Sequence, residues 1–199
     1  MVKNKNSYKY IKGNSILRKV VDEYNLNLEE YFLLYSFYVT YSLCGNQSAK
    51  KKTFIDYGWK TNKTNNTDLG IALSSVLNLN RNPDFVFIED NINKQFLNHN
   101  LPDGEISDVD LERAVIVKSS ENNNYLRLFH RIRNGLAHGK YSLCYSKNNE
   151  KIVIIQDDDS YNVTARIVIK LSTLLNFITV VDKNNFLLSN KNLSKEISK

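Results

Sequence analysis

The sequence contains few cysteines, few prolines and no long apolar run. The two cysteines, Cys44 and Cys144, lack the spacing of a metal-binding or redox motif. Because the first residues carry no apolar segment, we expect no secretory signal and free thiols in a reducing cytoplasm. The most apolar window, Tyr31 to Gly45, is too short and too rich in hydroxyl groups to span a bilayer, so we expect a core helix there. The sequence shows no internal repeat.

The composition favours one globular domain of moderately basic charge. The chain has 199 residues, of which 42% are hydrophobic and 11% aromatic, enough to bury a core. Lysine and arginine number 27 against 21 acidic residues, giving a net charge of +6. This surplus fits a polyanionic partner such as RNA, and it fits equally well a basic surface with loose ends.

Apolar periodicity predicts a mainly α-helical domain over residues 15–183, between a flexible N-terminus (1–14) and a flexible tail (184–199). A small antiparallel β-element, a hairpin or a three-stranded meander, is expected after residue 139, where alternation replaces the helical period. Segment 84–100 is ambiguous, and segment 107–121 fits either one helix or an extended strand. The expected helices are 15–25, 28–44, 69–79 (capped by Thr67 or Asp68), 122–139 and 171–182, and the expected strands are 140–146, 151–157 and 161–170.

The stretch RLFHRIRNGLAHGKY, from Arg127 to Tyr141, combines an apolar and a polar helical face. At 100° per residue, one arc contains the side chains of Tyr125, Leu128, Phe129, Ile132 and Leu136. The opposite side contains Arg127, His130, Arg131, Asn134 and His138. Because His130, Asn134 and His138 are four residues apart, they stack along one face. That face carries cations and two groups that titrate near neutrality.

These polar residues are the groups that metal-free RNA cleavage requires. Attack of a ribose 2′-OH on the adjacent phosphodiester needs a base, an acid for the leaving oxygen, and cationic donors for the phosphorus oxygens. Histidine can act as acid or base, and arginine matches two phosphate oxygens. No set of residues has the spacing of metal ligands, and the acidic run from Asp157 to Asp159 is expected to be a solvated turn. We therefore expect no metal and no cofactor.

The motif RNGLAH, Arg133 to His138, resembles the R-N-x-x-x-H signature of the HEPN superfamily, and its flanks resemble those of small plasmid- and phage-defence HEPN proteins. The resemblance covers residues 121–182. It implies a helical bundle and a metal-independent endoribonuclease of toxin or abortive-infection type. It also implies a homodimer in which two motifs face one cleft, with Arg133, Asn134 and His138 as catalytic residues and products bearing a 2′,3′-cyclic phosphate and a 5′-OH.

The remaining polar residues of the stretch are candidates for substrate binding: Arg127, His130, Arg131, Lys140 and Tyr141. The expected partners are RNA, a second copy of the chain, and an antitoxin or regulatory protein. No membrane association is expected, and the expected location is the cytoplasm.

Alternatives remain for both the site and the function. On a straight helix Arg133 and His138 lie about 140° apart, so Arg131, which is closer to His138 on the helical wheel, is the alternative phosphate ligand. A helix C-terminus attracts histidine, lysine and arginine by its dipole, so the motif could be only a helix ending. The alternative functions are a non-catalytic HEPN module that binds nucleotide, RNA or a partner protein, and a purely structural helical protein.

Overall fold

The protein is built on a five-stranded mixed sheet with the strand order β1-β2-β5-β4-β3. The computed structural model describes residues 28–44, 50–89, 92–103, 106, 108–119, 121, 123–159 and 162–189. The expected flexible N-terminus and the expected helix at 15–25 lie outside the described residues. The strands are β1 (Phe85–Ile88), β2 (Arg113–Val117), β3 (Tyr141–Tyr145), β4 (Lys151–Asp158) and β5 (Val163–Lys170).

Strand pairing joins segments that lie far apart in the sequence. β1 and β2 pair in parallel, with Phe85 opposite Ala114. β2 then pairs antiparallel with β5, β5 with β4, and β4 with β3. The three strands expected after residue 139 are therefore present as an antiparallel meander, but they form only one part of a larger sheet in which β5 is central.

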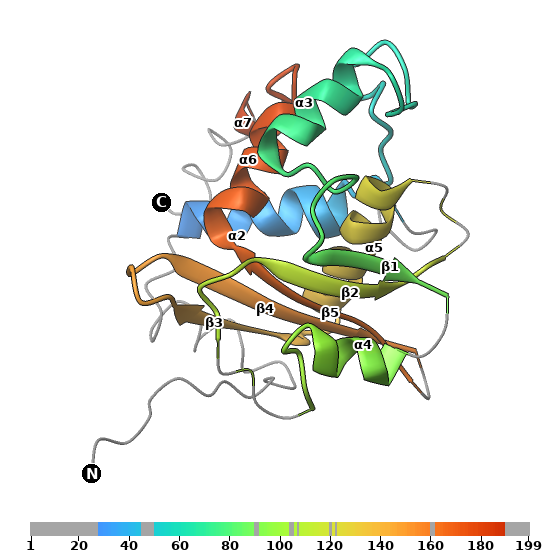
Figure 1. Ribbon diagram of the computed structural model, residues 1–199. Coiled ribbons are helices and arrows are strands. Elements are labelled where there is room, and N and C mark those ends of the chain that lie inside the picture. The colour runs from blue at the N-terminus through green and yellow to red at the C-terminus, as the bar shows by residue number, and fades with distance from the viewer. Residues whose placement is uncertain are drawn as a thin grey trace.

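Helices cover both faces of this sheet (Figure 1). α2, α3, α5 and α6 lie on one side, and α4 lies on the other. The larger core contains Val153 and Ile155 of β4, whereas Ile152 and Ile154 of the same strand pack in a second core with Phe96 of α4. The helical segments are α2 (Leu28–Leu34), the π-helix η1 (Tyr35–Thr40), α3 (Asp68–Val76), α4 (Ile92–Asn98), α5 (Asn124–Ala137), α6 (Leu171–Val181) and α7 (Phe186–Ser189).

The expectation of a mainly α-helical bundle of HEPN type is wrong. The strands missing from the prediction lie in the two ambiguous segments. Segment 84–100 forms β1 followed by α4, and segment 107–121 contains β2. A short apolar run such as AVIV, residues 114–117, fits a buried strand or a buried helix by periodicity alone. Pairing with β1 and β5 decides for the strand, since a backbone buried on both sides needs ladder partners for its N–H and C=O groups.

The remaining expected helices are present with shifted ends. α3 begins after Thr67, whose side chain accepts a hydrogen bond from the N–H of Gly70. The segment expected as one helix over 28–44 changes to π-helical geometry at Tyr35 and ends at Thr40. The segment expected to be loose over 184–199 contains α7, in which Leu187 is buried, and its residues 190–199 lie outside the described residues. Among the described residues, every helix is too short or too polar to cross a bilayer.

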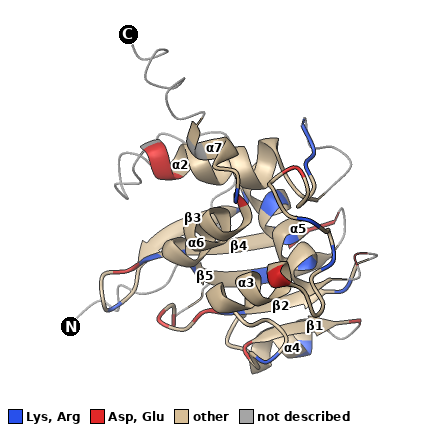
Figure 2. Ribbon diagram, turned by 90° about the horizontal axis from the view of Figure 1, so that it is seen from above, with Lys and Arg blue, Asp and Glu red and all other residues tan. Residues whose placement is uncertain are grey.

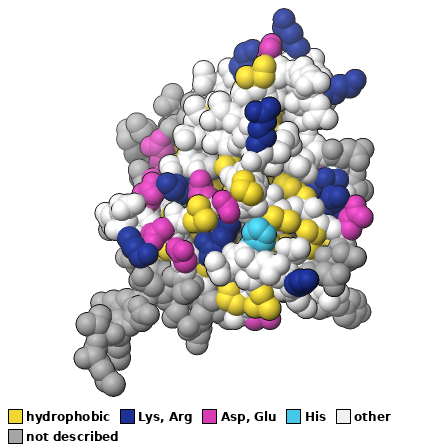
Figure 3. All heavy atoms as spheres, viewed as in Figure 1, with side chains coloured by type: hydrophobic (Ala, Val, Ile, Leu, Met, Phe, Trp, Pro, Cys, Tyr) yellow, Lys and Arg dark blue, Asp and Glu magenta, His cyan; other side chains and the backbone are white. Residues whose placement is uncertain are grey.

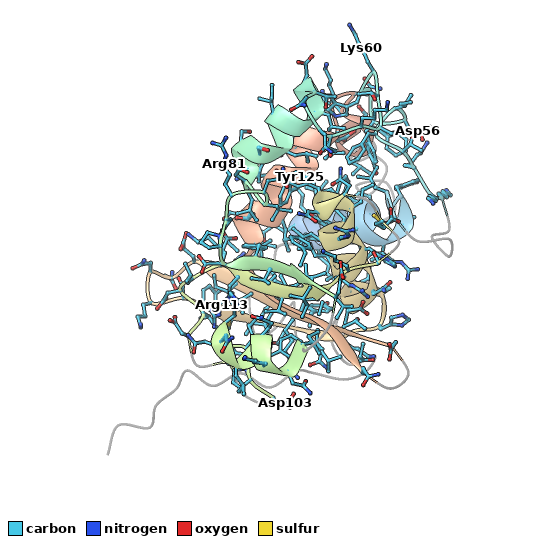
Figure 4. The ribbon with its side chains drawn as sticks, turned by 45° about the vertical axis from the view of Figure 1, so that its right-hand side comes forward. Asp56, Lys60, Arg81, Asp103, Arg113 and Tyr125 are labelled. Carbon is cyan, nitrogen blue, oxygen red and sulfur yellow. The ribbon has the colours of Figure 1, made fainter. Side chains whose placement is uncertain are left out.

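Two buried arginines fasten the α4 side of the molecule to the sheet. Arg113 (Figure 4) donates to the carbonyl oxygens of His99 and Asn100 at 2.8 and 2.9 Å. Arg166 lies over the ring of Phe96 at 4.3 Å and donates to the carbonyl oxygen of Leu101 at 2.9 Å. These contacts fix the loop after α4 to β2 and β5, so the two arginines have a structural role.

Candidate functional site

Helix α5 carries the candidate site, and its two faces separate as the sequence predicts. Asn123 caps the helix, because its side-chain oxygen accepts hydrogen bonds from the backbone N–H groups of Tyr125 and Leu126. The helix ends just before His138, and Gly139 follows with a φ of 63°. The five predicted apolar residues are buried. Figure 2 shows basic but no acidic residues along the ribbon of α5.

Helix α5 contacts β4 closely at Gly135. A Cβ atom at this position would lie 2.2 Å from Cγ2 of Ile155 and 3.2 Å from the carbonyl oxygen of Gln156. Any side chain here would therefore push the helix away from the sheet. The glycine of the motif thus has a packing role, and the close contact brings the neighbouring polar residues of α5 within reach of the end of β4.

A buried ion pair joins α5 to the sheet. Nη1 of Arg131 donates to Oδ2 of Asp157 at 2.9 Å, and only 11% and 3% of the two side chains are exposed. Arg131 also donates to Oγ1 of Thr164 at 3.0 Å and to the carbonyl oxygen of Val117 at 2.9 Å. Thr164, the extra residue of a β-bulge between β5 and β4, donates to Oδ2 of Asp157 at 3.2 Å. With these acceptors and this burial, Arg131 serves the packing of α5 on the sheet.

Asn134 links the buried ion pair to Arg133. Its Nδ2 donates to Oδ2 of Asp157 at 3.2 Å, and its Oδ1 accepts from Nη1 of Arg133 at 3.0 Å. A carboxylate only accepts and a guanidinium only donates, so one orientation of the amide satisfies both partners. Arg133 thereby reaches round the helix to the side that Asn134 shares with His138, one turn further on. This contact offsets the wide angle between Arg133 and His138 on a straight helical wheel, because it draws the guanidinium toward Asn134.

The two histidines of the polar face have different surroundings. His138 is exposed, and no described residue forms a hydrogen bond with its ring. His130 is half-buried, and its Nδ1 has no hydrogen-bond partner among the described residues. Burial, and then the charge of Arg131, lower the pKa of His130 below its ordinary value. Along the helix axis His130 is about 12 Å from His138, and Arg127 is about 16 Å from it.

Two further candidates for substrate binding lie away from this face. Lys140 forms an ion pair with Asp158. Along β4, Asp158 alternates to the same side of the sheet as Ile154, which is the side that α4 covers. Tyr141 is 3% exposed and packs in the larger core. Both residues follow the motif directly in the sequence. After the turn that ends α5, however, Lys140 pairs with Asp158 and Tyr141 enters the core, so neither lies on the polar face of the helix.

Sequence reasoning missed two residues that shape the site. Asp157, expected in a solvated turn, is 2% exposed. The available signal was its spacing, because Asp157 follows Val153 and Ile155 at intervals of two and so shares their core-facing side of β4. Tyr35 of η1 donates its hydroxyl hydrogen to the carbonyl oxygen of Leu136 at 2.9 Å, which fixes the last turn of α5. No local pattern pointed to that contact.

The site on α5 therefore combines an exposed imidazole with an oriented guanidinium. Arg133 can bind a phosphate oxygen, and His138 can exchange a proton with a bound group. On the face shown in Figure 3, lysine and arginine side chains lie among acidic and apolar ones. Within the described ranges, no three His, Cys, Asp or Glu side chains gather where they could hold a metal ion. No protein-family model, curated protein or solved structure matches this chain.

Proposed function

We propose that this protein is a metal-independent endoribonuclease that cleaves RNA with Arg133, Asn134 and His138 of two chains. The observation that carries the proposal is the orientation of Arg133. Asn134, itself held by the buried Asp157, draws the guanidinium to the side of α5 on which His138 is exposed. Nη1 of Arg133 donates to Asn134 and Nε is buried, so Nη2 is the donor left for a phosphate oxygen.

The proposed reaction is an internal transfer at one phosphodiester. The ribose 2′-oxygen forms a bond to phosphorus while the bond from phosphorus to O5′ breaks. One histidine accepts the proton of the 2′-OH, and a second, protonated histidine gives a proton to the departing O5′. Arg133 donates to the non-bridging oxygens, where negative charge grows in the transition state. The products carry a 2′,3′-cyclic phosphate and a 5′-hydroxyl.

The reaction needs two proton-transfer groups, an acid and a base, at one phosphate, and we expect two chains to supply them. On the polar face of α5, His138 is exposed, whereas His130 is half-buried and has a lowered pKa. Since the two rings are about 12 Å apart along the axis, one chain does not bring both to a single phosphorus atom. The second histidine is therefore His138 of another copy, and we expect a homodimer with the two helix ends facing each other.

We place this activity in the cytoplasm, where RNA is the substrate and thiols stay reduced. Cys44 and Cys144 are both buried and unbridged. A nuclease of toxin type must be restrained in its own cell, so an antitoxin or regulatory protein that covers the end of α5 belongs to the same proposal.

The second candidate function is RNA or nucleotide binding without cleavage, or docking of a partner protein at the same surface. One observation favours it. A catalytic histidine is usually held by a third group that fixes its tautomer, and no described residue makes such a contact with His138. In this reading Arg133 binds phosphate and His138 adds a polar contact.

The test is an RNA cleavage assay with the purified full chain in excess EDTA. We expect His138→Ala to reduce the cleavage rate by about 10²- to 10⁴-fold and Arg133→Ala by about 10²-fold or more. The matched controls are His99→Ala, after α4, and Arg81→Ala, an exposed arginine after α3; both should cleave as the unchanged protein does. Mapping of the RNA ends should show 2′,3′-cyclic phosphates.

Expression of the same variants in bacteria gives an independent readout. The unchanged protein should arrest growth and degrade cellular RNA, and His138→Ala should not. Folded, abundant protein that leaves RNA intact in both assays would favour the binding function. Cleavage that persists in His138→Ala would refute the proposed site.

A further inference from the structure

A polar pocket of about 240 Å³ lies at the first turn of α5. Segments far apart in the sequence form it: residues 64–65, the loop after α3, and residues 123–127. Four asparagines line it, Asn65, Asn80, Asn123 and Asn124. Tyr125, at one wall, is tied to α3 through a 2.8 Å hydrogen bond with Oγ of Ser74 and lies beneath that helix in Figure 4. The pocket is therefore a wet, amide-rich site and not a gap in the apolar core.

Arg127 makes the pocket positive. It lines the pocket, and none of the described lining residues is acidic. Its Nη1 donates to Oδ1 of Asn124 at 2.9 Å, which holds the guanidinium in place. Its Nε is buried and has no partner among the described residues. Because Arg127 lines the pocket, the guanidinium N–H groups other than Nε–H and the one bound to Asn124 can donate to a ligand there.

The ligand contacts come from side chains and not from the start of the helix. Oδ1 of Asn123 already accepts from the N–H groups of Tyr125 and Leu126. Asn65 and Asn80, in contrast, are exposed, and their amide groups have no partner in the described structure. Each amide offers both a donor and an acceptor, which matches the edges of a nucleobase and the hydroxyls of a ribose. Arginine matches a phosphate.

We propose that this pocket binds one nucleotide unit of single-stranded RNA, with its phosphate on Arg127 and its base or ribose on Asn65 and Asn80. The volume is below the range of about 300–1,000 Å³ for pockets that enclose drug-sized ligands, so it admits one nucleotide and not a folded RNA. A base must leave its stack to enter, which selects a single strand.

The position of the pocket agrees with a strand that continues to the proposed cleavage site. Arg127, Asn134 and His138 lie on one stripe of α5. The pocket is about 16 Å from His138 along the axis, a distance that a few nucleotides of an extended strand can cover. The inference rests on the proposed function in so far as that function makes RNA the ligand.

The test measures binding and not cleavage. Full-length protein carrying His138→Ala is titrated into a fluorescein-labelled uridine hexanucleotide, and fluorescence anisotropy reports the affinity. We compare Arg127→Ala and Asn80→Ala with Arg81→Ala, which removes the same charge from an exposed arginine next to Asn80. We expect the first two to weaken binding about tenfold, because each removes direct contacts to the ligand, and Arg81→Ala to change it less than twofold.

Circular dichroism checks that each variant is folded, and Asn80→Ala, in a loop, keeps the test decisive if Arg127→Ala fails to fold. Unchanged affinity in Asn80→Ala, or equal losses in Arg127→Ala and Arg81→Ala, would overturn the inference, since either result would indicate nonspecific charge attraction. The cleavage assay is separate. If RNA binding depends on Arg127 and Asn80 but no RNA is cleaved, only the nuclease proposal is refuted. If RNA is cleaved but its binding does not depend on these two residues, only the pocket proposal is refuted.

Discussion

Replacement of Asp157 by asparagine tests whether the buried ion pair holds α5 on the sheet. The substitution keeps the size of the side chain but removes the charge opposite Arg131, whose side chain is 11% exposed. The Oδ2 atom accepts from Arg131, Asn134 and Thr164, and the amide oxygen of asparagine can take that position, so the substitution mainly removes the negative charge. Removal of one partner from a buried pair costs about 3–5 kcal/mol, because the other charge stays buried without compensation. We expect a loss of unfolding free energy in that range.

Urea denaturation followed by circular dichroism measures this free energy. For a chain of this length the melting temperature falls by about 2–4 °C per kcal/mol, so thermal unfolding should shift down by roughly 6–20 °C. Asp158→Asn is the matched control, because Asp158 and its partner Lys140 have 23% and 25% of their side chains exposed. Because this pair keeps more contact with solvent than Arg131 and Asp157 do, its removal should cost less than the removal of the buried pair.

A paired replacement separates the charge effect from a loss of packing. Arg131→Met combined with Asp157→Leu removes both charges and should recover most of the stability lost in Asp157→Asn. If Asp157→Asn costs no more than Asp158→Asn, the ion pair does not hold the helix. The single variants Arg131→Met and Asp157→Leu complete the cycle. If the double variant loses the sum of these two single losses, the side chains are not energetically coupled, and the reasoning is refuted.

Other predictions concern single residues of α5. Leu136→Ala should cost roughly 2–5 kcal/mol because Leu136 is buried, whereas His138→Ala on the exposed side should cost under about 0.5 kcal/mol; chemical denaturation compares the two. Gly135→Ala should cost roughly 1–3 kcal/mol, since its Cβ would meet Ile155, and amide chemical shifts should change along α5 and β4. Because the folded chain lowers the pKa of His130, the unfolded chain binds more protons below about pH 6.5. Stability should therefore fall from pH 7 toward pH 5, less steeply in His130→Gln, and an equal slope in thermal melts would contradict this.

The sequence predicted α5 well because the signals for it are local. Its apolar residues recur at helical spacing, and Gly139 ends the helical pattern. The helix observed over Asn124–Ala137 lies within the predicted range of 122–139, and its apolar face is the buried one. The meander after it was also predictable, since strict alternation over consecutive residues distinguishes a strand from a helix.

The central strands were not predictable in the same way. AVIV in β2 is an uninterrupted apolar run without a distinguishing period, and FVFI in β1 is only four residues long. Their conformation depends on pairing across the sheet: β1 pairs with β2, and β2 pairs with β5, which is some 50 residues further along the chain than β2. Local patterns therefore predicted too few strands and too much helix.

The sequence by itself determined which residues form the polar face of α5, because the order of residues on a helix fixes its faces. Only the tertiary structure decided which of these residues are used for packing and which stay accessible. Asp157 and Thr164, which come from β4 and β5, bury Arg131 and orient Asn134, and through Asn134 they direct Arg133 toward the side of His138. The physical reason is that burial and charge pairing depend on which distant segments meet, and no local pattern specifies that meeting.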